Sequence, residues 1–192
     1  MANSGVFSID DINFLKDNQQ YPSLGQLELI ETQVASSVTY LDFLNIKEDI
    51  YNVHFVTFND IKWGTADTFK SRLSDDGGIS FESTNSYYSA QQYGNSGGTF
   101  GESTRNPESE FDRILQNAAN LSHNGYIYFY NLGDSSTNSY MTQHTINWGS
   151  GRMQFKIGAQ VYEVASKINA IRFYTNTYAW TGSISLYGLR FS

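Results

Sequence analysis

The feature that most constrains this chain is the alternation of apolar and polar side chains in short segments along most of its length. In SISLYG, Ile184 and Leu186 alternate with Ser183 and Ser185, which is the two-residue period of a half-buried strand. About ten segments alternate in this way or form short apolar runs between turn-forming residues: QLELIETQ, VTYLDFL, YNVHFVTFND, TFKSRLS, GISFES, GYIYFYNL, SYMTQHTINW, RMQFKIG, KINAIRFYT and GSISLYGLRF. Short strands at this spacing, with little helix, predict a jelly-roll-like, two-sheet antiparallel β-sandwich.

Composition agrees with one β-rich core. The 192 residues include 14 Tyr and 13 Phe against 3 Met and 2 Pro, and aromatic side chains fit the pleated, half-buried surface of a sheet. A chain of this length suits a single domain. We therefore expect a single sandwich over residues 25–192.

A short helix is predicted before the sandwich. In FSIDDINFLKD, Ser8 is placed as the N-cap with Asp11 three residues later, and Phe7 can pack on Ile12. A helix of about ten residues is marginal alone in water, so its apolar side chains need a surface to rest on: Phe7, Ile9, Ile12, Phe14 and Leu15. They either cover the core of the same subunit or make residues 1–24 an arm that docks on a neighbour.

One additional short helix is expected in NPESEFDRILQNAANL, because Pro107 suits a helix start and Phe111, Ile114, Leu115 recur at helical spacing. The preceding SAQQYGNSGGTFGESTRNPESE is polar and rich in glycine. It predicts a long surface loop, or an excursion that another subunit organises. SDDGGIS predicts a hairpin loop whose glycines adopt positive φ.

Charge and cysteine content exclude several classes of function. The formal charge is −7, and the 12 Lys and Arg residues are scattered singly, so no basic patch for nucleic acid is expected. No apolar run is long enough for membrane insertion, and the N-terminus lacks the pattern of a signal peptide. The chain has no cysteine, so it forms no disulfide and has no thiol chemistry.

Catalytic and metal-binding patterns are weak. His54, His123 and His144 each stand alone in their segments, without the spacing that metal ligation or a nucleophile requires. Two facing carboxylates would suffice for a glycoside hydrolase, but sequence places no two of the candidate acids across one cleft: Glu28, Glu31, Asp42 and Glu163. A calcium site would draw on Asp75, Asp76 and Asp134, although acids in such turns are more often turn formers. We expect no catalytic residue, cofactor or metal.

Aromatic residues near expected loops suggest a carbohydrate-binding surface, because flat rings pack against the apolar faces of sugars. The candidate glycan contacts are Trp180, Tyr87, Tyr88 and Trp148. Trp63 belongs to the same group, and the alternative for all of them is that they cover the rim of the core.

Most of the chain resembles small structural proteins of marine tailed bacteriophages, such as those that infect cyanobacteria or pelagic bacteria. The resemblance is carried by these segments in order: SIDDINFLK, PSLGQLELIETQVASSVTYLDF, YNVHFVTFNDI, RLSDDGGISFES, NGYIYFYNLG and VASKINAIRFYTNTYAWTGSISLYGLRFS. The ending I-x-x-I-R-F…G-x-I-S-L-Y-G-[LIV] corresponds to Ile168, Ile171, Arg172, Phe173, Gly182, Ile184, Ser185, Leu186, Tyr187, Gly188 and Leu189. These motifs consist of strand and turn residues and carry no catalytic residue.

The resemblance implies a non-enzymatic virion protein that is made and assembled in the host cytoplasm. Our leading expectation is a decoration or head-fibre protein that contacts copies of itself, with a trimer as the first guess, and capsid or tail proteins. The alternative is a tail-fibre or tail-tip module that binds host surface glycans, and a remote alternative is a polysaccharide hydrolase.

Overall fold

A computed structural model describes residues 8–17, 27–65, 67–115, 119–149 and 151–189. Within these residues the structure has one helix and eleven strands. The helix is α1 (Ile9–Asp17), and the strands are β1 (Leu27–Val38), β2 (Tyr40–Phe43), β3 (Val53–Trp63), β4 (Phe69–Ser74), β5 (Tyr87–Asn95), β6 (Phe100–Glu108), β7 (His123–Tyr130), β8 (Ser139–Gly149), β9 (Arg152–Tyr162), β10 (Ala170–Thr175) and β11 (Trp180–Leu189).

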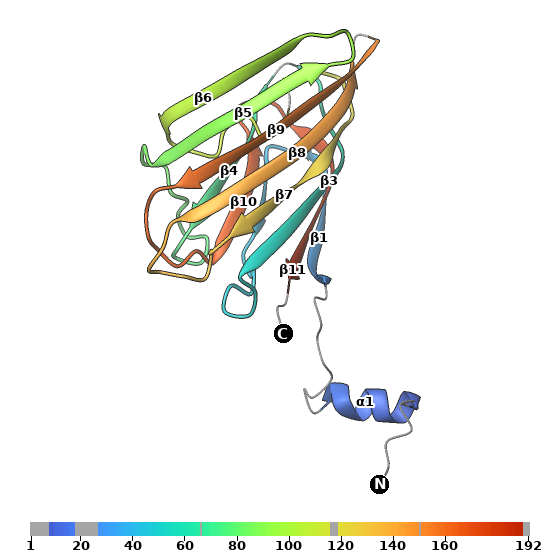
Figure 1. Cartoon of the computed structure of the whole chain (residues 1–192), viewed down its shortest axis with the longest axis vertical. Coiled ribbons are helices and arrows are strands. Elements are labelled where there is room, and N and C mark those ends of the chain that lie inside the picture. Colours follow the sequence, from blue (N-terminus) through green and yellow to red (C-terminus); the bar gives the residue numbers. More distant parts are fainter. Residues whose placement is uncertain (1–7, 18–26, 66, 116–118, 150, 190–192) are drawn as a thin grey trace.

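The strands form two antiparallel sheets that pack as a sandwich, which confirms the predicted fold class. The large sheet has eight strands in the order β1-β11-β3-β7-β8-β9-β5-β6, and the small sheet has three in the order β2-β10-β4. Figure 1 shows the large sheet in front, with β4 and β10 behind it.

The strand pairing is that of a jelly roll with two added hairpins. The first strand pairs with the last (β1 with β11), β2 pairs with β10, and β3 pairs with β7. The next pair inward is reduced to one bridge between Ser71 of β4 and Phe111. Folding a strip of such nested pairs produces the two sheets of a jelly roll. The hairpins β5–β6 and β8–β9 extend the large sheet beyond this frame.

Two sequence-based expectations between residues 90 and 123 are wrong. The expected glycine-rich loop is the hairpin β5–β6, which turns at residues 96–99. The expected second helix is absent from residues 106–115 and 119–121, the described part of its range. Pro107 lies in β6 at the sheet edge, where a missing N–H is tolerated. Arg113 has a φ of 53°, which a helix does not allow.

The apolar residues of that segment are explained by burial without a helix. The N–H and C=O of Phe111 pair with the backbone of Ser71, at 2.9 and 3.0 Å. Phe111, Ile114 and Leu115 are fully buried in the core. Their helical spacing therefore reflects an irregular segment that crosses the core, residues 109–115, which we call the crossing segment.

The expected hairpin after β4 is also wrong. Residues 79–82 form no strand, and the chain passes from β4 in the small sheet to β5 in the large sheet. Gly77 and Gly78 do adopt positive φ, at 77° and 85°, as predicted. The other nine predicted strand segments each contain a strand of the structure.

The core between the sheets is dominated by aromatic side chains. Phe58 of the large sheet meets Phe69 and Phe173 of the small sheet edge-on, with ring centroids 5.8 and 5.4 Å apart. Phe69 and Phe173 are stacked at 6.2 Å. Rings of this size remove large apolar areas from water, the main favourable contribution to folding.

The helix α1 begins with the predicted capping box. Ser8 Oγ accepts the N–H of Asp11 at 3.1 Å, and the Asp11 carboxylate accepts the N–H of Ser8 at 2.9 Å. Ile9 and Phe14 are exposed, and Figure 1 draws α1 apart from the sandwich. Phe7 and the side chains of Ile12 and Leu15 lie outside the described residues. Among the described residues, no helix is both long and apolar enough to cross a membrane.

Candidate functional site

The large sheet has one face against the small sheet and one face directed away from it, which we call the outer face. In β8 the residues of the inner face are buried and alternate with outer-face residues that are at least partly exposed. The strand register then assigns the outer-face residues of β7, β9, β5 and β6. This alternation is expected of a sheet with one solvated face.

Aromatic side chains form a continuous row on the outer face. Phe55 of β3 lies 4.7 Å from Tyr128, 5.7 Å from Tyr126 and 5.9 Å from Tyr187 between ring centroids. Tyr128 stacks on Tyr130 at 6.3 Å. The row therefore spans β11, β3 and β7.

Further apolar side chains continue the outer face onto β8, β9 and β6. They are Ile146, Trp148, Met153, Phe155, Ile157 and Phe100. Trp148 is 65% exposed and Phe100 is 73% exposed. Among the outer-face positions of β7, β8, β9, β5 and β6, Glu102 is the one acidic side chain, and none is Lys or Arg.

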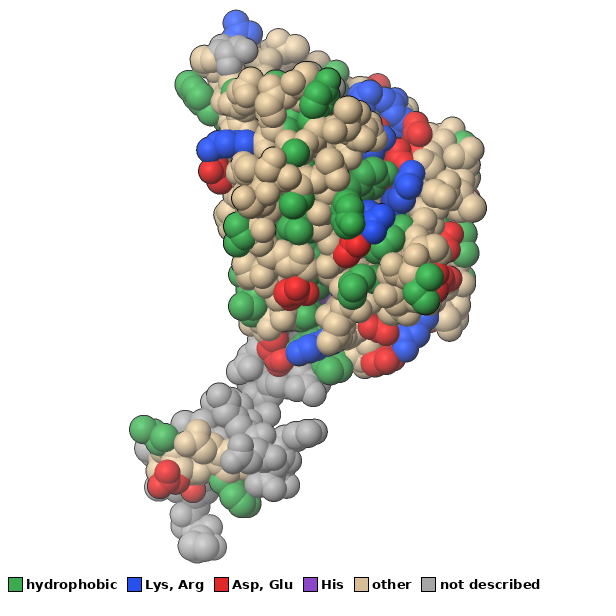
Figure 2. All heavy atoms as spheres, turned by 180° about the vertical axis from the view of Figure 1, so that it is seen from behind, with side chains coloured by type: hydrophobic (Ala, Val, Ile, Leu, Met, Phe, Trp, Pro, Cys, Tyr) green, Lys and Arg blue, Asp and Glu red, His purple; other side chains and the backbone are tan. Residues whose placement is uncertain are grey.

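The opposite side of the molecule is different. Figure 2 shows Lys, Arg, Asp and Glu side chains mixed on the face that carries the small sheet. There Arg172 of β10 forms a two-pronged pair with Asp42 of β2, with both contacts at 2.7 Å. The Arg172 guanidinium also lies over the rings of Tyr40 and Phe81. Charged side chains are thus frequent on this side and rare on the outer face of β7, β8, β9, β5 and β6.

A groove crosses the outer face at right angles to the strands. Its floor is a row of small residues in direct register, Ala159, Ala90 and Thr104, on β9, β5 and β6. The next row on one side contains Tyr140, Val161 and Tyr88. The hollow between these rows has a volume of about 590 Å³.

The predicted glycan contacts separate into two groups. Trp180 and Tyr87 are buried in the core, each 1% exposed, so their proposed role as surface contacts is wrong. Trp180 meets Phe69 edge-on at 5.1 Å, and Tyr87 meets Phe111 at 4.9 Å. Trp63, the further residue of that group, is also buried.

The other two candidates lie on the outer face. Tyr88 lines the groove, and a hydrogen bond to Glu163 raises the pKa of its hydroxyl. Trp148 is near the far end of β8, outside the groove lining. Tyr140 also lines the groove and was missed, although the alternation in SYMTQHTINW places Tyr140 and Trp148 on one face.

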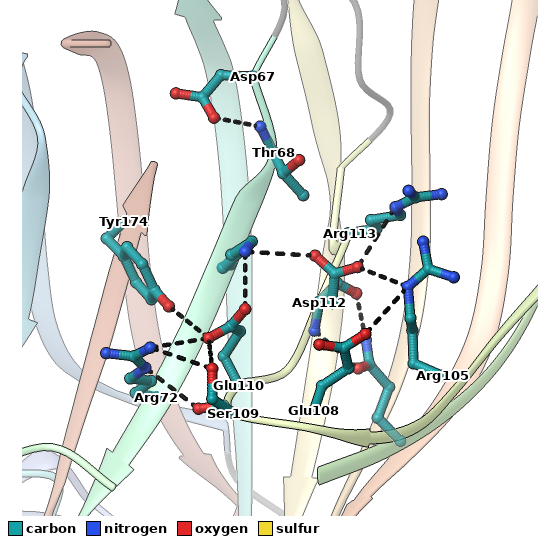
Figure 3. A network of polar contacts seen from close by, with 12 residues as sticks. Asp67, Thr68, Arg72, Arg105, Glu108, Ser109, Glu110, Asp112, Arg113 and Tyr174 are labelled. Carbon is teal, nitrogen blue, oxygen red and sulfur yellow. Dashed lines mark hydrogen bonds and ion pairs between the residues drawn. The ribbon is translucent and has the colours of Figure 1, made fainter. Parts of the chain in front are cut away.

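A network of charged side chains ties the small sheet to the crossing segment (Figure 3). Glu110 accepts hydrogen bonds from Lys70 at 2.7 Å, Arg72 at 2.8 Å and Tyr174 at 3.1 Å, and from the Ser109 hydroxyl. Burial opposes ionisation of Glu110, but the bonds from Lys70, Ser109 and Arg72 outweigh it and hold its pKa at about 2. The carboxylate therefore stays ionised as the centre of this network.

The adjacent carboxylate of Asp112 binds two guanidinium groups. Its Oδ2 lies 3.4 Å from Arg105 Nε and 3.3 Å from Arg113 Nε. Figure 3 shows both arginines on the same side of Asp112. Lys70 Nζ is more distant, at 3.9 Å from Oδ1.

Three buried glutamines of the large sheet hold the backbone of the crossing segment. Gln91 and Gln160 donate to the carbonyl of Asp112 at 2.9 and 3.1 Å, and Gln143 donates to the carbonyl of Ile114 at 3.3 Å. Gln160 also accepts the N–H of Asp112 at 3.1 Å. Buried backbone groups need such partners, so these side chains replace the hydrogen bonds of a strand.

The candidate calcium ligands serve their own turns. Asp76 accepts hydrogen bonds from Ser80 and Ser74, which lower its pKa to about 2. Asp134 accepts the N–H and hydroxyl of Ser136. The backbone carbonyl of Asp75 accepts the amide of Asn169. The described residues contain no group of three or more His, Asp or Glu that could hold a metal ion.

The acids considered for hydrolysis have separate partners. Glu28 accepts the Tyr51 hydroxyl at 2.6 Å, Glu31 accepts the Gln33 amide at 2.8 Å, and Asp42 binds Arg172. The structure does not arrange them as a facing pair in a described groove.

Comparisons of the chain with protein-family models, with curated proteins and with solved structures found no match.

Proposed function

We propose that this chain is a non-enzymatic structural protein of a phage particle, of the decoration or head-fibre type, and that it assembles with further copies of itself through the outer face. The phage setting rests on the resemblance of its motifs. The assembly surface rests on one observation, the broad apolar and almost uncharged outer face of β7, β8, β9, β5 and β6.

Charge favours a second copy as the occupant of this face. The chain carries a formal charge of −7, so two copies that approached through charged faces would repel each other. The outer face of β7, β8, β9, β5 and β6 avoids this cost, because Glu102 is its one acidic residue. Extended apolar faces on a folded protein commonly mark interaction surfaces.

Residues 1–24 are proposed as the arm that attaches the sandwich to the particle. The described part of this arm is a capped helix with Ile9 and Phe14 exposed. Removal of residues 1–24 should leave the sandwich folded and abolish particle binding, measured by co-sedimentation with particles that lack the protein. Normal binding of the truncated chain would refute the role of the arm.

The copy number in purified virions tests the proposed function. Mass spectrometry with labelled standards gives the ratio of this protein to the major capsid protein. A ratio near that of the capsid lattice supports a decoration protein, whereas a few copies per particle would favour a tail component. Absence from purified particles would contradict the proposal.

A second candidate function, binding of host surface glycans, is favoured by the groove. Tyr88 and Tyr140 offer aromatic rings beside a floor of small side chains, with the Thr104 and Asn106 side-chain groups in the lining. Sugars present apolar faces and hydroxyl edges, which rings and short polar side chains can match.

Paired tyrosine substitutions test this candidate. Tyr140→Ala should reduce adsorption of the protein to host cells, because it removes one wall of the groove. Tyr178→Ala is the matched control, since Tyr178 is a half-exposed tyrosine outside the groove lining. Equal adsorption by both variants and the wild type would remove the support for glycan binding at this site.

A further inference from the structure

A second cavity lies beneath the edge of the large sheet, on the inner face. It has a volume of about 400 Å³ and is lined by Tyr93, Glu102, Ser103, Thr104, Arg105, Arg113 and Lys156. Here the β5–β6 hairpin extends the large sheet beyond the three strands of the small sheet. The Tyr93 ring covers Gly101, where an added Cβ would lie 2.7 Å from the ring.

Three of the lining side chains are cations. Arg105 and Arg113 each direct Nε to the same oxygen of Asp112. Arg105 also donates through Nη1 to the Thr104 carbonyl at 3.1 Å. Lys156 is 3% exposed and donates to the Arg113 carbonyl at 2.9 Å. Among the described residues, no carboxylate lies within ion-pair distance of Lys156.

Comparison with its neighbours shows that the charge of Lys156 is surplus to its structural task. Gln91, Gln143 and Gln160 hold the carbonyls of the same crossing segment with neutral amides. A neutral donor could hold the Arg113 carbonyl in the same way, without the cost of burying an ammonium group. The ammonium has three donors, and the Arg113 carbonyl accepts one of them.

The ion pairs around Asp112 involve the two arginines and leave Lys156 out. Around Asp112, the carboxylates of Glu108 and Asp112 face Arg105, Arg113 and Lys156. Glu102 also lines the cavity, so three carboxylates match the three cations, but among the described residues none of these carboxylates lies within ion-pair distance of Lys156.

From this geometry we propose that the cavity formed by Arg105, Arg113, Lys156 and Ser103 binds a compact oxyanion group of a ligand, such as a carboxylate, sulfate or phosphate. The oxyanion would accept hydrogen bonds from the ammonium of Lys156 and from the guanidinium groups, and such charge-assisted bonds are the stronger ones. Lys156 and Arg105 occupy inner-face positions, whereas the assembly surface proposed above is the outer face, and Thr104 and Arg105 line both this cavity and the groove.

The test is calorimetric titration of the full chain with sodium sulfate, phosphate and acetate, each against sodium chloride at matched ionic strength and pH 7. We expect saturable binding of at least one of these anions above the chloride background. Preference for sulfate or phosphate would identify a tetrahedral group, and preference for acetate would identify a carboxylate. Equal heats from all three and from chloride would overturn the proposal.

Two variants locate the site. Lys156→Met keeps the unbranched stem and removes the ammonium, so binding should weaken about ten-fold or more. Arg113→Gln removes a partly exposed guanidinium and should weaken anion binding to a similar extent. If circular dichroism shows that Lys156→Met does not fold, Arg113→Gln provides the test of the site. Lys62→Met is the matched control, because Lys62 is an exposed cation outside the cavity. Wild-type affinity in the folded cavity variants would refute this site.

The pH dependence gives an independent readout. Burial, with Arg113 and Arg105 nearby, lowers the pKa of Lys156 to about 8, although Asp112 opposes this shift. Binding should therefore weaken from pH 7 to pH 9.5 in the wild type, and this loss should be absent in Lys156→Met. The same loss in both proteins would contradict a role for Lys156.

Discussion

At the residue scale, His54 shows how burial determines the protonation state of one side chain. The ring is fully buried, and its Nε2 lies 2.8 Å from the carbonyl of Ile46. Its Nδ1 has no hydrogen-bond partner among the described residues. Burial lowers the pKa of His54 to about 4, against a smaller opposing effect of the bond to Ile46. The folded protein therefore holds a neutral imidazole at pH 7.

Acid should destabilise the protein through His54. The unfolded chain takes up a proton near pH 6.5 and the folded chain only near pH 4, so stability is present above pH 6.5 and is lost as the pH falls toward 4. We expect a loss of about 2 kcal/mol in the free energy of unfolding between pH 7 and pH 5. In His54→Gln, which retains a donor for Ile46, this part of the loss should disappear. Urea denaturation at both pH values measures it, and equal losses would contradict the assignment.

The same substitution should have very different effects on stability at two tryptophans. Trp180→Ala removes a ring from the core and should lower the free energy of unfolding by about 3–5 kcal/mol. Trp148→Ala changes an exposed outer-face residue and should shift it by no more than about 0.5 kcal/mol in the isolated protein. Chemical denaturation of both variants checks this, and similar losses would show that the burial of Trp180 is misassigned.

At the scale of the element, β11 is an interior strand of the large sheet, next to the edge strand β1. It pairs with β1 on one side and β3 on the other. Gly188 of β11 allows the ring of Tyr51 to lie directly on the backbone, since an added Cβ would lie only 2.2 Å from Cγ of that ring. The Tyr51 hydroxyl donates to Glu28 of β1, so this contact joins two strands.

Gly188→Ala should therefore force Tyr51 away from β11. Overpacking of this kind typically costs about 1–3 kcal/mol, and we expect a loss of that size in the free energy of unfolding. Gly64→Ala is the control, because an added Cβ there meets nothing within 4 Å. Thermal or urea denaturation of the two variants makes the comparison. An unchanged midpoint for Gly188→Ala would contradict the packing described.

The elements also show what the sequence could predict. Nine strands and the Ser8–Asp11 capping box were predictable, because local alternation and capping depend on nearby residues. The hairpin β5–β6 was missed because the outer face of β5 carries the small or polar residues Ala90, Gln92 and Gly94 in place of large apolar ones, so the period of two is not visible. The crossing segment was mistaken for a helix because three-dimensional burial produced a helical spacing.

Prediction of the groove from the sequence would have required the register between strands that are distant in the chain. The groove floor joins Ala159, Ala90 and Thr104 from three strands, and no local pattern reveals that they form one row. Tyr88 was identified as an aromatic near a loop, whereas Trp180 and Tyr87 were misplaced because loop proximity does not report burial.

At the scale of the whole molecule, the two sides of the sandwich differ in charge. The small sheet carries ion pairs and cation–π contacts, and the outer face of the large sheet carries aromatic and aliphatic side chains. This asymmetry suits a protein that meets other copies through one side and water through the other. The central claim is that the outer face is the assembly surface.

The most direct measurement of that claim is the mass of the purified chain by light scattering as a function of concentration. The wild type should be oligomeric, and Ile157→Lys should shift it to the monomer, because it places a charge in the centre of the outer face. Ile79→Lys makes the same change at a residue that is 89% exposed and lies outside the outer face, and it should leave the oligomer intact. A monomeric wild type, or an oligomer that survives Ile157→Lys, would contradict the account.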